Sequence, residues 1–169
     1  MAKMIPITPF LAFPYRSCYN LRVFRPTDSG LHGYAEAIMT RKTLEWTPEY
    51  SVGVEIIDEQ HKKLFSILDE LIRADFSAAD RDWQREKLEE LIEYMRYHFQ
   101  YEEELIGKFH PVDLEMHRAQ HDEFRRQVAK LYDRWLKGAG DVGDSAIAFL
   151  AEWISRHVLE VDRKYGPFM

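Results

Sequence analysis

The run HFQYE at residues 98–102 and the run HRAQH at residues 117–121 are the stretches that decide the fold. The first run places a His and a Glu four residues apart, and the second places two His four residues apart. On an α-helix such residues lie one turn apart on the same face, so each pair can converge on one point. Gly107 and Pro111 separate the runs and predict a turn between two successive antiparallel helices. Two helices that each aim such a pair inward are typical of a metal site in a helical bundle.

The composition is that of one globular domain. The chain has 169 residues, of which 46% are hydrophobic and 31% charged, so a substantial core is possible. The net charge of −6 and the lack of a basic stripe argue against nucleic acid as a partner, and no apolar run approaches a membrane span. The single cysteine, Cys18, excludes an internal disulfide and a cysteine-based zinc or iron–sulfur site. We expect a cytoplasmic monomer.

Residues 1–43 differ from the rest of the chain. They hold four of the seven prolines and show no sustained helical period. The apolar piece at residues 4–13 contains Pro6 and Pro9, and no small-residue cleavage motif follows it, so we do not expect a secretory signal. We predict an irregular N-terminal extension that is either disordered or not translated, with Met39 as an alternative start. The extension up to residue 38 is expected to be dispensable.

The remaining residues, 44–169, predict an all-α fold. Residues 44–57 read as an extended segment, because Pro48 disfavours helix at the residue before it. Apolar residues then recur at spacings of three and four, the pattern of amphipathic helices. The pattern predicts four helices, with Asp58 and Asp144 capping the first and the last, over residues 58–74, 83–106, 112–135 and 144–165. Short connections between them favour an up-down-up-down four-helix bundle.

Seven polar residues fall on the stripes that the periodicity assigns to the core. They are His61, His98, Glu102, His117, His121, His157 and Asp162. A single His on an apolar face is usually a hydrogen-bonded core residue. Burying all seven without partners, however, would cost on the order of several kcal/mol for each ionised group. A metal centre would supply a partner for all of them at once.

The types of these side chains narrow the choice of metal. Zinc prefers four ligands, and seven are too many for one tetrahedral ion. Seven ligands suit two octahedral ions if the carboxylates bridge them. Imidazole and carboxylate together favour iron, and manganese suits so many imidazoles less well.

At these residues the chain resembles the hemerythrin family, and most closely its single-domain bacterial members. The resemblance covers residues 44–166 and rests on Trp46, the segment 51–61, and the runs HFQYEEE from His98, HRAQHDEF from His117 and HVLEVD from His157. It implies a bundle with two non-haem iron ions joined by an oxo or hydroxo bridge. His117, His121 and His157 would hold one iron, His61 and His98 the other, and Glu102 and Asp162 would bridge the pair.

The resemblance also implies an O2 pocket. Trp153, Ile154 and Val158 match the positions that line the family's apolar pocket, although plain core packing explains them equally well. The five-ligand iron would keep one position open for O2. Residues 1–43 have no counterpart in the single-domain form, and KFHP at residues 108–111 replaces the usual Tyr-Pro.

We therefore expect reversible O2 binding, in a carrier, store or local supplier of O2, and not an enzyme. Five neutral imidazoles and two carboxylates reverse the ratio of ferritin-like di-iron proteins, which use about four carboxylates and two His. The extra negative charge of those enzymes helps to stabilise the high-valent iron needed to cleave O2. Two alternatives stay open: a di-iron oxidoreductase acting on peroxide or nitric oxide, and an O2- or redox-sensing module with a separate partner.

Overall fold

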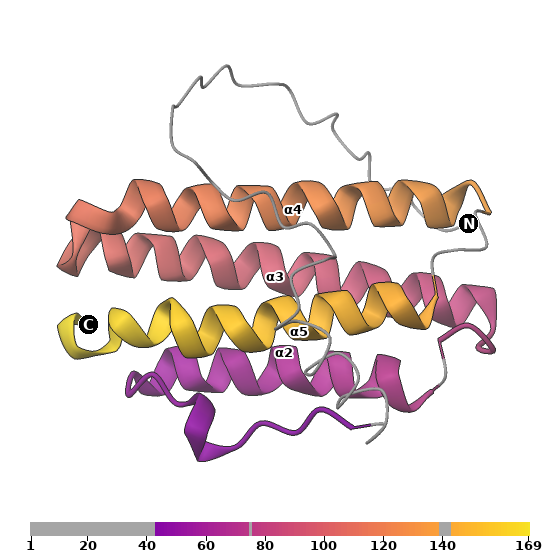
Figure 1. Ribbon diagram of the computed structural model, residues 1–169, viewed down its shortest axis with the longest axis horizontal. Helices are drawn as coiled ribbons and strands as arrows, with labels where there is room; N and C mark the ends of the chain where they lie inside the picture. The colour runs from indigo at the N-terminus through magenta and orange to yellow at the C-terminus, as the bar shows by residue number, and fades with distance from the viewer. Residues whose placement is uncertain (1–42, 75, 139–142) are drawn as a thin grey trace, which may run out of the picture.

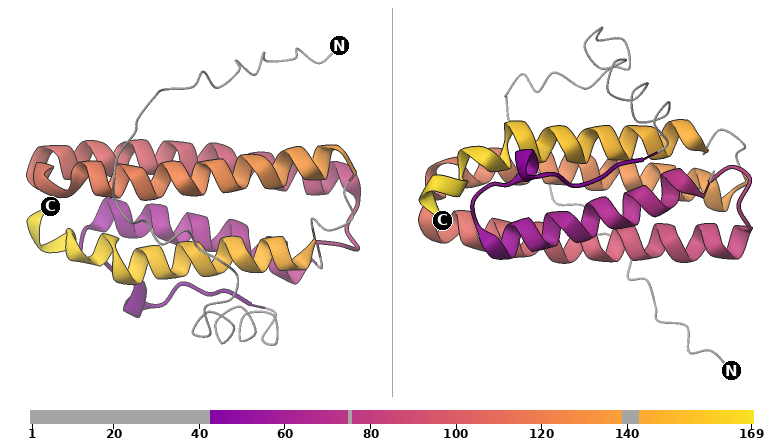
Figure 2. Two further views of the ribbon diagram at one scale, coloured as in Figure 1. Left: turned by 45° about the horizontal axis from the view of Figure 1, so that its top comes forward. Right: turned by 90° about the horizontal axis from the view of Figure 1, so that it is seen from below.

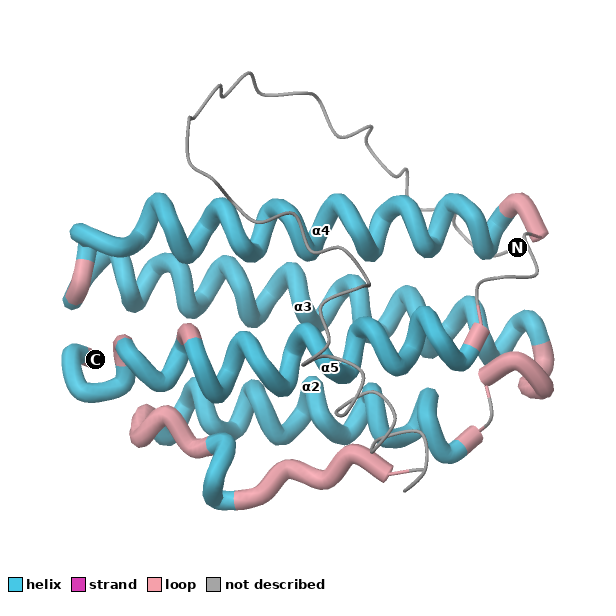
Figure 3. The backbone as a smooth tube through the Cα atoms, in the orientation of Figure 1, coloured by secondary structure: helices cyan, strands magenta, loops and turns pink. Residues whose placement is uncertain are grey.

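The computed structural model describes residues 43–74, 76–138 and 143–169, and almost all of them lie in helices or tight turns (Figure 3). The four long helices are α2 (Glu55–Arg73), α3 (Arg81–Phe109), α4 (Leu114–Leu136) and α5 (Asp144–Glu160). The short 3₁₀ turns are η1 (Pro48–Tyr50), η2 (Pro111–Asp113), η3 (Asp162–Lys164) and η4 (Gly166–Phe168). The predicted N-terminal extension, apart from Thr43, lies outside the described residues.

Successive helices run in opposite directions, as the colour gradient in Figure 1 shows. Helix α2 packs against α3 and α5, and α3 packs against α4. The views in Figure 2 show two layers, with α3 and α4 in one and α2 and α5 in the other. This arrangement confirms the predicted all-α, up-down-up-down bundle.

The core follows the predicted apolar stripes. The largest side chains that are fully buried include Phe65, Phe99 and Phe124, which come from α2, α3 and α4. Some predicted core residues at the edges of the stripes, such as Ile72 and Leu131, are half-buried. Because each helix is apolar on one face only, none of the described helices has the length and apolarity needed to cross a lipid bilayer.

The start of α2 differs from the prediction. Asp58 does not cap the helix, because α2 begins at Glu55 and Val54 occupies the N-cap position. The Asp58 carboxylate instead accepts hydrogen bonds from the Ser51 hydroxyl at 2.6 Å and from the Val52 N–H at 2.8 Å. Asp58 therefore holds the segment that precedes α2 against the first turn of the helix.

Both ends of α5 also differ from the prediction. Gly143, in a non-helical conformation, is the N-cap, and Asp144 is the first helical residue. The helix ends at Glu160 and not near residue 165, so Asp162 lies in the separate turn η3. The backbone of Gly166 then approaches the carbonyl oxygen of Val52 so closely that a Cβ would clash. The C-terminal turns are thus packed against the segment that leads into α2.

Candidate metal centre

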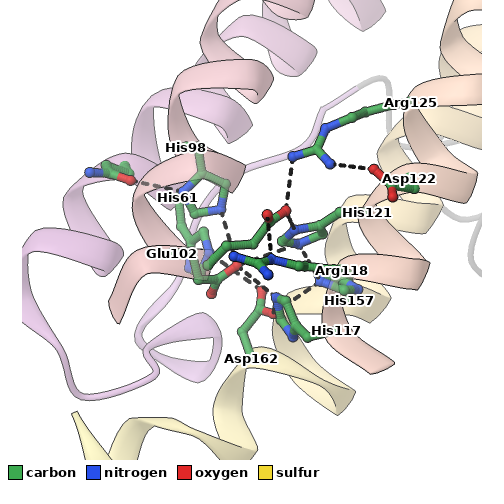
Figure 4. A network of polar contacts seen from close by, with 12 residues as sticks. His61, His98, Glu102, His117, Arg118, His121, Asp122, Arg125, His157 and Asp162 are labelled. Carbon is green, nitrogen blue, oxygen red and sulfur yellow. Dashed lines mark hydrogen bonds and ion pairs between the residues drawn. The ribbon is translucent and has the colours of Figure 1, made fainter. Parts of the chain in front are cut away.

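The bundle brings all seven predicted polar residues into one buried cluster (Figure 4). Each of the seven residues is at most 5% exposed. Each helix contributes at least one of them, and the turn η3 contributes the last. They are His61 from α2, His98 and Glu102 from α3, His117 and His121 from α4, His157 from α5, and Asp162 from η3.

The cluster divides into two groups that share one carboxylate. The three-histidine group is Glu102, His117, His121, His157 and Asp162, and the two-histidine group is His61, His98 and Glu102. Within each group the candidate donor atoms lie within 4.8 Å of one another, which is close enough for one cation to reach all of them. Glu102 belongs to both groups, so its carboxylate lies where it can contact two cations.

The histidines face the carboxylates through Nε2. The Nε2 atom of His117 lies 3.0 Å from Glu102 Oε2, and that of His157 lies 3.1 Å from Asp162 Oδ1. The other oxygen of Asp162, Oδ2, lies 3.5 Å from Nε2 of His61, which belongs to the two-histidine group. The two carboxylates therefore lie between the groups, and the imidazoles surround them.

The polar atoms of the cluster fit a metal because many of them lack a hydrogen-bond partner. Both ring nitrogens of His61, Oε1 of Glu102 and both oxygens of Asp162 are buried without a hydrogen bond. The Nε2 atoms of His121 and His157 point at each other across 3.0 Å. A cation between buried acceptors that face one another would satisfy them, because desolvation without a partner is costly.

Burial also opposes charge on most of these groups. It lowers the pKa of His157 to about 3 and shifts the pKa of His98 and His121 well below the ordinary value. Burial likewise raises the pKa of Asp162 to about 6. Burial lowers the pKa of His117 too, but the hydrogen bond that its Nε2 donates to Glu102 and the negative charges of Glu102, Asp162 and Glu103 outweigh burial and leave that pKa raised. Neutral imidazoles are the form that binds metal.

These shifts predict how the metal-free protein responds to acid. Below pH 6.5 the unfolded chain takes up protons on His98, His121 and His157 that the folded chain takes up only at much lower pH. The stability due to the neutral imidazoles is thus complete above about pH 6.5 and is lost as the pH falls. Glu102, Asp162 and His117, with raised pKa values, act in the opposite direction and offset part of this loss.

We expect the free energy of unfolding of the metal-free protein to fall by about 1 kcal/mol or more between pH 7 and pH 5, since each excess proton contributes about 1.4 kcal/mol per pH unit. Urea denaturation after chelation, followed by circular dichroism at both pH values, measures the change. Equal or greater stability at pH 5 would contradict the assignment of neutral buried histidines.

Two further polar residues contact the cluster from outside, and the sequence analysis did not identify them. The side-chain oxygen of Gln60 lies 2.9 Å from Nδ1 of His98, and Oε1 of Glu103 lies 2.9 Å from Nδ1 of His121. Gln60 directly precedes His61, and Glu103 directly follows Glu102. This adjacency is the only sequence signal for them, because their contacts depend on how the helices pack.

Aromatic rings cover the three-histidine group. Phe99 stacks on His121 with ring centroids 3.7 Å apart, and Trp153 stacks on His157 at 4.3 Å. Ile154 and Val158, which flank His157 in the sequence, are each 2% exposed, while Trp153 is half-buried. The three predicted pocket residues are therefore part of the apolar surroundings of the cluster, and whether they admit O2 remains a prediction.

The fold and the cluster together define a four-helix-bundle protein with a buried candidate metal-binding site. The family model described as "Hemerythrin HHE cation binding domain" matches residues 52–169. The chain therefore belongs to the hemerythrin family.

Individual relatives agree with this assignment. The bacteriohemerythrin of Methylococcus capsulatus is 30% identical over 125 residues, which cover 73% of this chain and 95% of the relative. The hemerythrin-like protein of Naegleria gruberi is 32% identical over 120 residues, covering 71% and 88%. A crystal structure of wild-type hemerythrin superposes with a TM-score of 0.67 at 31% identity, covering 73% of this chain and 95% of that one.

Proposed function

We propose that this chain binds O2 reversibly at two iron ions held by the seven clustered residues. His117, His121 and His157 hold one ion, His61 and His98 hold the other, and Glu102 and Asp162 bridge them. One observation carries the proposal: five buried imidazoles surround two buried carboxylates, and one of these carboxylates belongs to both groups of donors. The hemerythrin and bacteriohemerythrin relatives support iron and O2 as the partners.

The donor set favours iron over the commoner alternatives. The three-histidine group offers five residues as donors, more than tetrahedral zinc accepts. Calcium and magnesium prefer oxygen ligands, and here the imidazoles outnumber the carboxylates. Mixed imidazole and carboxylate ligands at about six positions suit iron.

The two groups are unequal, which gives O2 a place to bind. The two-histidine group has fewer protein donors than the three-histidine group, so His61, His98 and Glu102 would leave more room for O2 beside a bound ion. Iron bound by these residues would supply the electrons for O2 binding. The protein side chains contribute the geometry, and the bridging carboxylates keep the two ions next to each other.

The surroundings favour release of O2 over its consumption. Reduction of O2 to water needs protons delivered to the site. Phe99 stacks on His121 and Trp153 on His157, and Ile154 and Val158, on either side of His157 in the sequence, are each 2% exposed. An apolar enclosure of this kind excludes water and the protons that it carries. The apolar enclosure therefore favours a carrier, store or local supplier of O2 over an oxidoreductase.

Anaerobic loading with Fe(II) tests the proposal. We expect about two iron ions per chain, because the donors form two groups. Exposure to air should produce new visible absorption bands, and flushing with argon should restore the ferrous spectrum. Elemental analysis and visible spectroscopy measure both results.

Two outcomes would overturn the proposal. One zinc ion per chain with iron absent, after expression in iron-rich medium, would refute the di-iron assignment. Continuous O2 uptake with added reductant and no return under argon would refute reversible binding. The second result would favour the oxidoreductase alternative instead.

A further inference from the structure

The Nδ1 atoms of His98 and His121 have different environments in the two groups. In the two-histidine group, Nδ1 of His98 faces the neutral side-chain amide of Gln60 at 2.9 Å. In the three-histidine group, Nδ1 of His121 faces the carboxylate of Glu103 at the same distance. One group is therefore backed by a neutral acceptor and the other by a negatively charged one.

Glu103 is itself fixed in place by two arginines of α4, Arg118 and Arg125, which are labelled near His121 in Figure 4. Arg125 donates to Oε1 of Glu103 at 2.9 Å, and Arg118 donates to Oε2 at 3.3 Å. Arg125 also donates to Asp122 at 2.7 Å, which orients its guanidinium group. The side chain of Glu103 is only 13% exposed, so this network is shielded from solvent at its inner end.

The ring of His121 is held on its face as well as on its edge. Phe99 stacks on it with an interplanar angle of 9°, and the Arg125 guanidinium lies 5.1 Å from the centre of the same Phe99 ring. With the face packed and Nδ1 hydrogen-bonded to Glu103, rotation of the ring would break both contacts. The remaining nitrogen, Nε2, therefore points into the cluster, 3.5 Å from Glu102 Oε2.

We propose that Glu103 is a positioning residue for His121 and makes the three-histidine group the tighter of the two cation sites. The proposal relies on the proposed function only for the roles of His121 and His98 as metal ligands. A carboxylate that accepts Nδ1–H fixes the tautomer and makes Nε2 a stronger donor to a cation. Hydrogen bonds to an ionised acceptor are about twice as strong as neutral ones, so Gln60 does the same for His98 only weakly.

Cobalt(II) binding tests this proposal without iron or O2. Metal-free wild type, Glu103→Ala and Glu103→Gln are titrated with Co(II), and the two binding steps are followed by the visible bands of the bound ion. We expect Glu103→Ala to weaken the tighter step by about 10- to 100-fold, the range typical of lost outer-shell partners. Glu103→Gln keeps the shape and an acceptor oxygen, so its loss should be smaller.

Two matched variants locate the effect. Glu104→Gln removes the same charge from the next residue, which is exposed on α3, and should leave both steps unchanged. Gln60→Ala should weaken the weaker step and spare the tighter one. The imidazole proton on Nδ1 of His121, observed by NMR in the cobalt-free protein, should shift in both Glu103 variants and in neither of the other two.

The outcomes separate this proposal from the proposed function. If Glu103→Gln and Glu104→Gln bind Co(II) as wild type does and the Nδ1 proton does not move, Glu103 has no positioning role, whatever the protein does with O2. A Glu103 effect confined to the weaker step would also overturn the proposal. If the wild-type iron protein fails to return O2 while the cobalt results hold, the function proposal fails and the role of Glu103 stands.

Discussion

Replacing Glu102 with Ala is expected to abolish the paired metal centre. Among the described residues, Glu102 is the only one that belongs to both donor groups, and it is completely buried. Its Oε2 atom lies 3.0 Å from Nε2 of His117 and 3.9 Å from Nε2 of His98, so its loss removes a donor from each group at once. We expect iron content to fall from about two ions per chain to one or fewer, since bridging is lost. Elemental analysis and visible spectra of the reconstituted protein measure the loss.

Two companion variants make this result specific. Glu104→Ala changes an exposed glutamate on the same helix and should keep both irons. Glu102→Gln preserves the side-chain volume but removes the negative charge, so it reports on metal binding even if the Ala variant folds poorly. Two irons and an unchanged spectrum in both Glu102 variants would show that this carboxylate does not bridge the ions.

Replacing Ile154 with Asn is expected to shorten the life of the O2-binding form. Ile154 is 2% exposed and lies three residues before His157, so both residues share one face of α5. An amide at this position brings hydrogen-bonding capacity, and with it water, into an apolar enclosure. If one new hydrogen bond lowers the barrier to irreversible oxidation by about 1.4 kcal/mol, O2-binding capacity should be lost about tenfold faster under air. Iron content should remain near that of the wild type.

The isosteric pair Ile154→Val and Ile154→Thr controls for packing. Both variants remove volume, and they differ mainly in one hydroxyl group in place of a methyl group. The Thr variant should lose O2-binding capacity faster than the Val variant, as measured by repeated cycles of air and argon. Equal decay rates in Val, Thr and Asn variants would show that polarity at this position does not control oxidation.

Much of the bundle and its cluster followed from periodicity. In α4, His117 and His121 occupy the same three-and-four spacing as Phe124, Val128 and Trp135, and all five are buried. A spacing that repeats with the helical turn depends only on local geometry, so it can be read from the sequence. The same reasoning placed Glu102 and His157 in the core.

The features that sequence reasoning missed depend on tertiary contacts. Three consecutive glutamates occupy residues 102–104, and periodicity selects the first as inward but says nothing of the second. The role of Glu103 depends on Arg118 and Arg125, which α4 brings alongside α3. Asp162 was correctly placed in the cluster, but the end of α5 before it was missed: Val161, with φ of −113° and ψ of −63°, ends the helix although no Gly or Pro lies nearby before residue 166.

The location of Asp162 in η3, beyond the end of α5, has a consequence for the order of folding. About 100 residues separate it from His61, so closing that loop costs entropy before any cation can repay it. The C-terminal turns dock through Gly166 on the backbone of Val52, next to the start of α2. Asp162, the last candidate donor, therefore reaches its place only when the C-terminal turns have packed against the segment that leads into α2. If the cluster binds ions as proposed, we expect metal binding to complete folding and local opening of these turns to set how fast an ion escapes, because local opening costs less free energy than global unfolding.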